Sequence, residues 1–360
     1  MKDSYLTAGI KLNNLLHLLS RNPVSLTPKT TFRLLFLLQS SGWSSLFALV
    51  EKRKFARKLE MYPVPKNPVF IIGHWRTGST LLHQFLSKDP NLIAPTLFQV
   101  AVPDSLLTSY RYYRPIFKYL VSEHRPMDKV RLGMDEPQED EYAIYRTTGA
   151  SPLEDLVFPK SQAYFLSGSD KFIPTDDQIN YWIDQLQLFY KKLNYKGKKR
   201  IVSKNPFNSM RIPLLIKSFP EAKFIHIHRH PYEVIPSTIH MWDILQQQNS
   251  LNKNACRPSI TEVTTMMDKL LTTIRNEFQT LPSGSRAEVR FDELEKNPVK
   301  AIRGIYKELG LDFTAEFERN IDDYHQEARN FYKNEFVLSP QDAAWIYSKM
   351  KTHMEHFGYH

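Results

Sequence analysis

The glycine loop at residues 73–80, Gly-His-Trp-Arg-Thr-Gly-Ser-Thr, constrains the fold more than any other feature of the sequence. It follows the apolar run at residues 68–72, and apolar residues then recur at helical spacing until Asp89 and Pro90 end the pattern. A strand, a glycine loop and a helix in this order cradle phosphate groups in P-loop proteins. Ser79 replaces the usual P-loop lysine, so we expect a phosphate-bearing ligand held for a purpose other than nucleotide hydrolysis.

Further strand-to-helix units follow the glycine loop. Residues 200–203 and 222–228 are rich in strand formers, and a helical pattern comes after each. A strand at 287–291 and a helix from Pro298 to Gly310 repeat the order near the C-terminus. This alternation predicts an α/β fold: a three-layer sandwich with a central parallel sheet, P-loop-like and nucleotide-binding. Ligands of such sheets bind beyond the carboxyl ends of the strands.

Around this body we expect additional helical material. Residues 1–60 are predicted to form an N-terminal helical extension, and residues 61–360 the main domain. The stretch from about 95 to 199 is rich in tyrosine, proline and charge, and it contains one clear amphipathic helix around residues 179–189. Inserted material of this kind is expected to build the walls on the acceptor side of a site.

The N-terminal extension contains two apolar stretches, residues 32–38 and 43–50, separated by the polar residues 39–42. The polar break and Arg33 predict two short helices rather than one helix that spans a membrane. Two interpretations stay open for them. The helices either pack on the protein's own core or lie on a membrane surface, where the basic residues 51–58 would meet anionic headgroups.

Charge and cysteine content narrow the partners and the compartment. The chain has 48 Lys and Arg against 38 Asp and Glu, a net charge of +10, which favours anionic partners. Its single cysteine, Cys256, excludes an internal disulfide framework and any multi-cysteine metal site. The N-terminus has no signal-peptide pattern. We therefore expect a cytoplasmic protein, peripheral to the membrane if the apolar extension lies there.

The glycine loop offers several groups that bind anions. Backbone N–H groups from Thr77 through Gly78 and Ser79 to Thr80 are expected to point at a phosphate, at the positive end of the following helix. The three hydroxyls in this stretch add donors. Arg76 supplies the charge that the missing lysine would supply, and a guanidinium binds two oxygens at once. The alternative is an ordinary glycine turn with a surface arginine.

A second group of residues follows the strand at 222–228. Arg229 at the strand end and Ser237 in the next helix are spaced to converge on one phosphate. His226, His228 and His230 alternate along the same stretch and mimic a metal-binding pair. The pattern has no third carboxylate or thiolate ligand nearby, so we predict no metal site.

With both groups in view, the sequence resembles the sulfotransferases that use 3′-phosphoadenosine 5′-phosphosulfate (PAPS). The stretch GHWRTGSTLLHQFL resembles the family's 5′-phosphosulfate loop, in the arginine-bearing version of Golgi-type and many bacterial members. The stretch FIHIHRHPYEVIPSTIHMW resembles its 3′-phosphate site. Residues 201–229 and 289–311 agree with the segments around that site, whereas the resemblance is loose between about 95 and 199 and absent before 60.

The resemblance implies a reaction and roles for residues. PAPS would donate a sulfuryl group and leave as adenosine 3′,5′-bisphosphate, and no metal is required. Arg76 and the loop up to Thr80 would bind the phosphosulfate, while Arg229 and Ser237 would bind the 3′-phosphate. Lys204 stands where the cytosolic branch has a lysine that contacts the transferring group. Lys333 lies in a late basic segment of the kind that helps to close over the nucleotide.

The catalytic base departs from the family pattern. Pro206 occupies the position of the histidine of the cytosolic branch, and residues 94–100 lack the glutamate of the protein-tyrosine branch. The acidic segment that begins at Asp135 resembles one seen in many bacterial members, and from it we predict Glu139 and Glu141, which would share a face if extended. The alternative for both is an acidic first turn of a helix. A lesser candidate is His83, more typical of a packed core histidine.

These features predict sulfation of a small hydroxyl acceptor. The apolar N-terminus and the 22 Phe, 18 Tyr and 5 Trp favour a hydrophobic alcohol such as a sterol or another lipid. Alternatives are sulfation of a carbohydrate or a protein tyrosine, a P-loop kinase, and a non-catalytic membrane-surface or nucleic-acid-binding protein. The last requires a basic stripe, whereas the densest basic cluster, residues 191–200, is predicted to be an exposed loop, so we expect no nucleic-acid partner.

Overall fold

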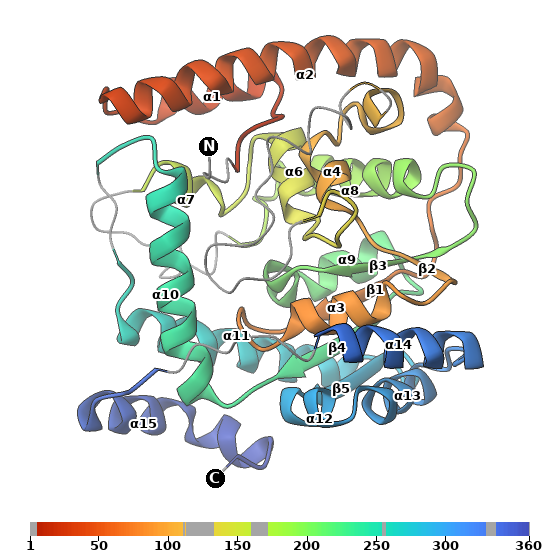
Figure 1. The fold of residues 1–360 in the computed structure, drawn as a ribbon, viewed down its shortest axis with the longest axis vertical. Coiled ribbons are helices and arrows are strands. Elements are labelled where there is room, and N and C mark those ends of the chain that lie inside the picture. Colours follow the sequence, from red (N-terminus) through yellow and green to blue (C-terminus); the bar gives the residue numbers. More distant parts are fainter. Residues whose placement is uncertain are drawn as a thin grey trace. The chain divides into compact units, whose positions relative to one another are not determined.

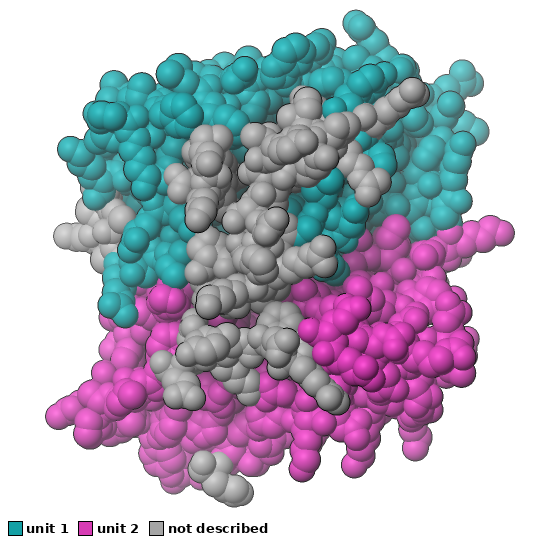
Figure 2. Space-filling view, viewed as in Figure 1, with its two compact units in different colours: residues 1–65, 95–197, 242–257 teal, residues 66–94, 198–241, 258–360 magenta. Residues whose placement is uncertain are grey.

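The computed structural model describes residues 6–110, 112, 133–159, 172–253, 257–328 and 336–359. Its two compact units are coloured separately in Figure 2. Unit 1 comprises Met1–Pro65, Pro95–Gly197 and Trp242–Arg257, and unit 2 comprises Lys66–Ala94, Lys198–Met241 and Pro258–His360. The predicted Lys333 and the single cysteine, Cys256, lie outside the described residues.

Unit 2 is built on a parallel sheet. In the described part of the chain, five strands pair in the order β2-β3-β1-β4-β5 (Figure 1) and every neighbouring pair is parallel. The strands are β1 (Val69–Ile72), β2 (Leu92–Ile93), β3 (Arg200–Lys204), β4 (Lys223–His228) and β5 (Arg286–Arg290). This confirms the predicted α/β class with a central parallel sheet. The two-residue edge strand β2 was not predicted.

Strand order places the predicted ligand loops side by side. Strands β1 and β4 are neighbours, with Ile71 in register with Ile225. The chain leaves β1 towards β2 at one edge of the sheet and leaves β4 towards β5 at the other. Such a reversal opens a crevice at the carboxyl ends of the two strands, where ligands bind in open α/β sheets. Both predicted phosphate loops begin at these ends.

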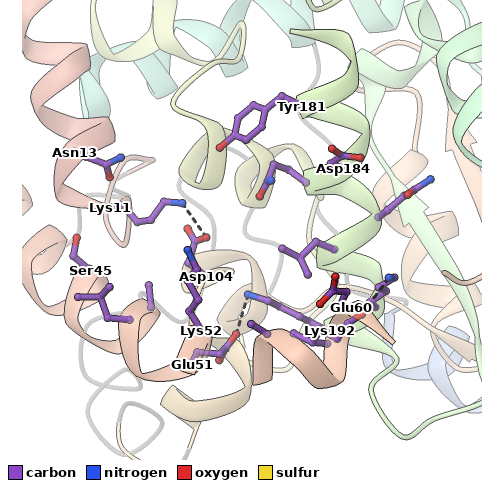
Figure 3. Close-up of a pocket in the computed structure, with 18 residues that line it drawn as sticks. Lys11, Asn13, Ser45, Glu51, Lys52, Glu60, Asp104, Tyr181, Asp184 and Lys192 are labelled. Atoms are coloured by element: carbon purple, nitrogen blue, oxygen red, sulfur yellow. Dashed lines mark hydrogen bonds and ion pairs between the residues drawn. The ribbon is translucent and has the colours of Figure 1, made fainter. Parts of the chain in front are cut away.

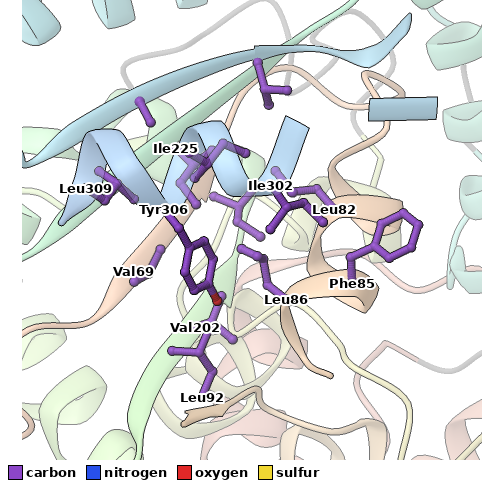
Figure 4. Packing of buried hydrophobic residues seen from close by; sticks show 14 of the residues in the cluster. Val69, Leu82, Phe85, Leu86, Leu92, Val202, Ile225, Ile302, Tyr306 and Leu309 are labelled. Carbon is purple, nitrogen blue, oxygen red and sulfur yellow. The ribbon is translucent and has the colours of Figure 1, made fainter. Parts of the chain in front are cut away.

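Helices cover both faces of the sheet in unit 2. They are α3 (Ser79–Leu86), the 3-10 helix η3 (Pro206–Met210), α9 (Ile212–Ser218), α10 (Pro231–Asn249, divided between the units), α11 (Ile260–Thr280), α12 (Phe291–Lys296), α13 (Pro298–Leu309), α14 (Ala315–Ala328) and α15 (Pro340–His356). One apolar cluster joins α3, α13 and α14 to the sheet (Figure 4). On the other face, Phe70 of β1 packs against Phe219, just after α9, and Phe224 of β4. The three layers are therefore present within this unit.

Helix α13 shows how the sequence builds this core. Asn297 caps its first turn by accepting a hydrogen bond from the backbone N–H of Lys300 at 3.0 Å, and Gly310 ends it with a φ of 60°. Between the caps, Ile302, Ile305 and Leu309 recur at helical spacing and are buried against the strands. The predicted helix at 298–310 is confirmed, and the predicted strand 287–291 ends one residue early because Phe291 begins α12.

Unit 1 is helical in its described residues. Its helices are α1 (Leu12–Arg21), α2 (Pro28–Glu60), α4 (Leu97–Ala101), α6 (Glu141–Thr148), α7 (Glu154–Val157) and α8 (Ile179–Leu193). The predicted amphipathic helix is α8, which buries Trp182, Leu186 and Phe189. Helices are also present in the predicted N-terminal extension.

The prediction of two short helices in that extension is wrong. Helix α2 runs without interruption through the polar residues 39–42. Ser41 and Ser44 are buried on the side that faces the rest of unit 1, so small polar residues serve as packing positions there and do not end the helix. The prediction that residues 191–200 form an exposed loop is wrong at Lys192. It lies in α8 with its side chain 8% exposed, paired with Glu51, not in an exposed loop.

Candidate active site

The glycine loop is held against strand β4 and helix η3. The backbone N–H of Gly73 donates to Ser209 Oγ at 2.9 Å, and that hydroxyl donates back to the Gly73 carbonyl at 3.2 Å. Gly73 has a φ of 142°, and a β-carbon there would lie 2.4 Å from the carbonyl oxygen of Ile227. Only glycine allows the loop to pass this close to β4. Sequence reasoning missed Ser209.

Arg76 joins the two predicted phosphate sites. Its Nε donates to Ser237 Oγ at 2.9 Å, although the two residues are 161 positions apart. Its backbone is left-handed, with a φ of 67°, a conformation that costs a residue with a β-carbon about 1–2 kcal/mol. Backbone strain of this kind persists where the surrounding structure fixes it, and it clusters at functional sites. The structure therefore brings the predicted 5′ and 3′ groups into direct contact.

Phe291 contacts both the glycine loop and the residue that follows β4, Arg229. Gly78, which caps α3 with a φ of 91°, approaches the Phe291 ring so closely that a β-carbon would lie 2.1 Å from it. The guanidinium of Arg229 lies over that ring at 4.4 Å and forms an ion pair with Glu233. Arg229 Nε is buried and makes no hydrogen bond to the described residues. The sequence signal for Phe291 was its place directly after β5, at the ligand edge of the sheet.

The hydroxyls of the glycine loop do not all point at a ligand. Thr77 is buried, and its hydroxyl donates to the carbonyl of His74 at 2.8 Å, so that side chain braces the loop. His74 is itself fully buried, and burial lowers its pKa to about 4, which keeps the ring neutral at pH 7. Ser79 is buried and Thr80 half-buried. What Thr77 offers an anion is its backbone N–H.

Lys204 is the last residue of β3, next to Ile71 of β1 in the register of the sheet. It is 3% exposed, so its ammonium is placed inside the protein at the carboxyl edge and not on the surface. The following Asn205 accepts a hydrogen bond from Phe207 N at 3.0 Å and caps η3. The alternative of a surface lysine at a strand end is therefore wrong.

The histidines of β4 have packing roles. His226 Nδ1 lies 2.9 Å from Glu288 Oε1, and His228 Nδ1 lies 2.9 Å from the hydroxyl of Tyr359. His228 also stacks on Phe357, with ring centroids 4.0 Å apart. Burial, reinforced by the nearby His226, lowers the pKa of His228 to about 2. Both rings belong to an aromatic cluster that holds the C-terminal residues.

The predicted base residues lie in unit 1, whereas the phosphate loops lie in unit 2. Asp140 has helical backbone angles, so Glu139 and Glu141 do not form the extended pair that was expected. Glu141 begins α6, is fully buried and accepts a hydrogen bond from Ser151 Oγ at 2.6 Å. Glu139 is half-buried. His83 is buried near the Val202 carbonyl, as a core histidine.

Unit 1 also contains a cavity of about 820 Å³. Helices α2 and α8 form much of its wall, and two ion pairs line it: Lys11 with Asp104 at 3.2 Å and Glu51 with Lys192 at 2.8 Å (Figure 3). Tyr181 of α8 adds an aromatic side chain to the lining. None of the described residues that line it was predicted to bind PAPS.

Comparisons with known proteins agree with the geometry of unit 2. The sequence profile described as "Sulfotransferase family" matches residues 68–315. Omega-hydroxy-beta-dihydromenaquinone-9 sulfotransferase Stf3, from Mycobacterium bovis and from Mycobacterium tuberculosis, is 30% identical over 324 residues, which are 88% of this chain and 81% of that protein.

Solved structures share the fold. Sulfotransferase STF9 from Mycobacterium avium superimposes with a TM-score of 0.72 at 18% identity, over 100% of this chain and 93% of that one. Sulfotransferase STF1 from Mycobacterium tuberculosis gives 0.63 at 15% identity, over 95% and 91%. Profile, relatives and fold thus agree with the loops of unit 2: the chain belongs to the sulfotransferase family and is an enzyme of that family.

Proposed function

We propose that the protein transfers a sulfuryl group from PAPS to the hydroxyl of a hydrophobic lipid alcohol. The hydrogen bond between Arg76 and Ser237 carries the proposal for the donor. It joins a phosphate-type loop to a second anion site at adjacent strand ends, as a ligand with phosphate groups at both its 5′ and 3′ positions requires. Membership of the sulfotransferase family argues against the alternative of a P-loop kinase.

The loops suggest how the reaction is assisted. PAPS supplies an activated sulfuryl group, whose bond to the bridging oxygen breaks as sulfur bonds to the acceptor oxygen. Arg76 and the backbone N–H groups of residues 77–80 would hold the phosphosulfate, and Lys204 would offset charge that develops on the leaving oxygen. The buried Arg229 Nε is left to meet the 3′-phosphate beside Ser237. Lys333 stays a prediction for this site.

The acceptor proton needs a base, and we keep Glu139 and Glu141 as the candidates. Of the two, Glu139 is the better candidate, because Glu141 is fully buried and already accepts a hydrogen bond from the Ser151 hydroxyl. If Glu139 is the base, Glu139→Gln lowers kcat and removes the acid limb of its pH profile, while Glu141→Gln changes mainly stability. The opposite pattern would assign the role to Glu141.

A lipid acceptor is supported by the relative named for an omega-hydroxylated menaquinone and by the apolar N-terminal helices. We further propose a cytoplasmic location with peripheral contact to a membrane, where such an acceptor resides. Sterols, long-chain alcohols and prenylated quinone alcohols form the first acceptor screen. Sulfation of glycans or tyrosine peptides with no turnover of any lipid alcohol would overturn this part of the proposal.

Calorimetric titration with adenosine 3′,5′-bisphosphate, with ATP in parallel, tests the donor site. We expect tight binding of the bisphosphate, weak binding of ATP, and loss of affinity by about tenfold or more in Arg76→Ala and Arg229→Ala, because each removes a charged contact to phosphate. Arg319→Ala is the matched control, since Arg319 is an exposed arginine on α14. Equal binding by all four proteins, or none, would show that both loops have been misassigned.

A further inference from the structure

Helix α2 exposes large apolar side chains to solvent and buries several polar ones, which is the opposite of a surface helix in a water-soluble domain. Phe32, Leu35, Trp43 and Leu46 are 57%, 61%, 53% and 50% exposed. Their spacing places them on one stripe at 100° per residue, which we call the outer face. The opposite side buries Leu37 and Leu59 together with five polar or charged residues: Thr30, Arg33, Ser41, Ser44 and Glu51. An exposed apolar stripe on a helix of 33 residues indicates that a membrane or another protein covers it.

Buried charges fix the rotation of the helix about its own axis. Arg33 donates to the Ser250 carbonyl at 2.9 Å and to the Gln247 carbonyl at 3.2 Å. Near the other end, Glu51 forms its ion pair with Lys192 and accepts hydrogen bonds from the backbone N–H groups of Leu107 and Thr108 at 2.7 and 3.0 Å. Turning the outer face inward would break both anchors, so this face stays outward.

The outer face continues into basic residues. Arg53 and Arg57 follow Leu46 on the same stripe, and Lys54 and Lys58 flank them, all four exposed. Aromatic and aliphatic side chains beside exposed lysine and arginine match the interface of an anionic bilayer, with acyl chains below and phosphates above. Leu26, which precedes the helix, is 75% exposed and extends the apolar surface.

By length and composition α2 could also cross a membrane, which alone is weak evidence. Crossing would carry Arg33 and Glu51 into hydrocarbon and away from their partners, at a cost that lying on the surface avoids. We infer that α2 lies in the interface of an anionic lipid bilayer, with its outer face in the acyl boundary and its arginines at the phosphates. The proposed lipid acceptor explains why the enzyme would bind a membrane, and in this respect the inference rests on the proposed function. The evidence for membrane binding is the exposed surface of α2, which does not depend on the reaction.

Vesicle flotation of the purified full chain tests the inference, without nucleotide or acceptor. We expect binding to vesicles of phosphatidylcholine with phosphatidylglycerol and weaker binding to phosphatidylcholine alone. Leu35→Ser and Leu46→Ser should each lower the partition coefficient about tenfold. Arg53→Gln and Arg57→Gln should each lower it about fivefold, only on the anionic vesicles.

Matched controls come from elsewhere in the chain. Val337→Ser removes an apolar side chain that is fully exposed, and Lys300→Gln removes an exposed charge from α13. Neither should change the partition coefficient. Equal losses in the controls, or no binding to anionic vesicles, would overturn the inference.

Two other occupants would give different results. A dimer that Leu46→Ser converts to a monomer would assign the outer face to a second copy of this chain. Resistance to alkaline carbonate extraction would assign α2 to a membrane span. Two other measurements test the proposed function independently of the membrane: titration with adenosine 3′,5′-bisphosphate and sulfation of a short-chain, water-soluble alcohol. A protein that passes both but does not bind vesicles would contradict only the inference about α2.

Discussion

Helix α13 of unit 2 buries Ile302, Ile305 and Leu309 and exposes its lysines, whereas helix α2 of unit 1 buries Arg33 and Glu51. The first is stabilised by apolar area removed from water, which depends little on exact geometry. The second depends on each buried charge meeting its partner, because burial of an unpaired charge is costly. The two helices therefore differ in which substitutions they tolerate.

The largest effect is expected where a charge loses its partner. Lys192→Ala leaves the Glu51 carboxylate, 2% exposed, without its ammonium, and should cost about 3–5 kcal/mol of unfolding free energy. Urea denaturation with hydrogen exchange read on peptides from α2 and α8 would measure it. Lys198→Ala, at an exposed lysine in the loop after α8, should stay within about 0.5 kcal/mol of the parent protein.

A paired replacement separates charge pairing from packing. Glu51→Leu with Lys192→Met removes both charges and keeps apolar volume, so it should recover most of the loss. A double variant as unstable as Lys192→Ala would mean that the hydrogen bonds of Glu51 to Leu107 and Thr108 carry the stability instead.

On the apolar side of the comparison, Ile305→Ala should cost about 2–4 kcal/mol, because it opens a cavity in the cluster between α13 and the sheet. Ile305→Val, which removes one methylene, should cost about 1 kcal/mol. Calorimetric melting of the three proteins measures the series. A loss that does not scale with the volume removed would contradict an apolar origin for the stability of α13.

Sequence periodicity was sufficient only for packing through apolar side chains, as in α13. The spacing in α13 and the apolar run of β1 predicted their burial and the sheet itself, whereas phosphate binding at the glycine loop stays a prediction. Sequence could not reveal that Ser41 and Ser44 line a buried helix face, nor that Lys192 meets Glu51, because these depend on which residues become neighbours in unit 1. Phe291 was missed for the same reason, since its contact with Arg229 spans 62 positions.

The stability of unit 2 should fall in acid, because this unit buries the neutral histidines His74 and His228. With a pKa of about 2 when folded and 6.5 as the reference value, His228 takes up a proton on unfolding at any pH between these values. The free energy of unfolding should therefore fall by about 1.4 kcal/mol for each pH unit below 6.5. His74, with a pKa of about 4 through burial, adds the same slope between pH 6.5 and 4.

His228→Gln tests this slope, since glutamine keeps a polar group near the Tyr359 hydroxyl but does not titrate. Urea midpoints from pH 7.5 to 5 should fall less steeply in the variant, by the equivalent of one proton. Parallel slopes for both proteins would show that His228 is protonated in the folded state.

The smallest effect concerns the start of α2. Thr27 and Thr30 form a capping box, with the Thr27 hydroxyl accepting the Thr30 N–H at 3.2 Å and the Thr30 hydroxyl accepting the Thr27 N–H at 2.8 Å. Thr27→Ala should cost about 1 kcal/mol, and Ser259→Ala at the matching box of α11 should cost a similar amount. Capping satisfies backbone groups at the helix end, whichever face is buried. Melting curves that show equal losses of stability for Thr27→Ala and Ser259→Ala would indicate that the two kinds of helix differ only in their buried faces. A far larger loss for Thr27→Ala would indicate that the first turn of α2 also contributes to the difference.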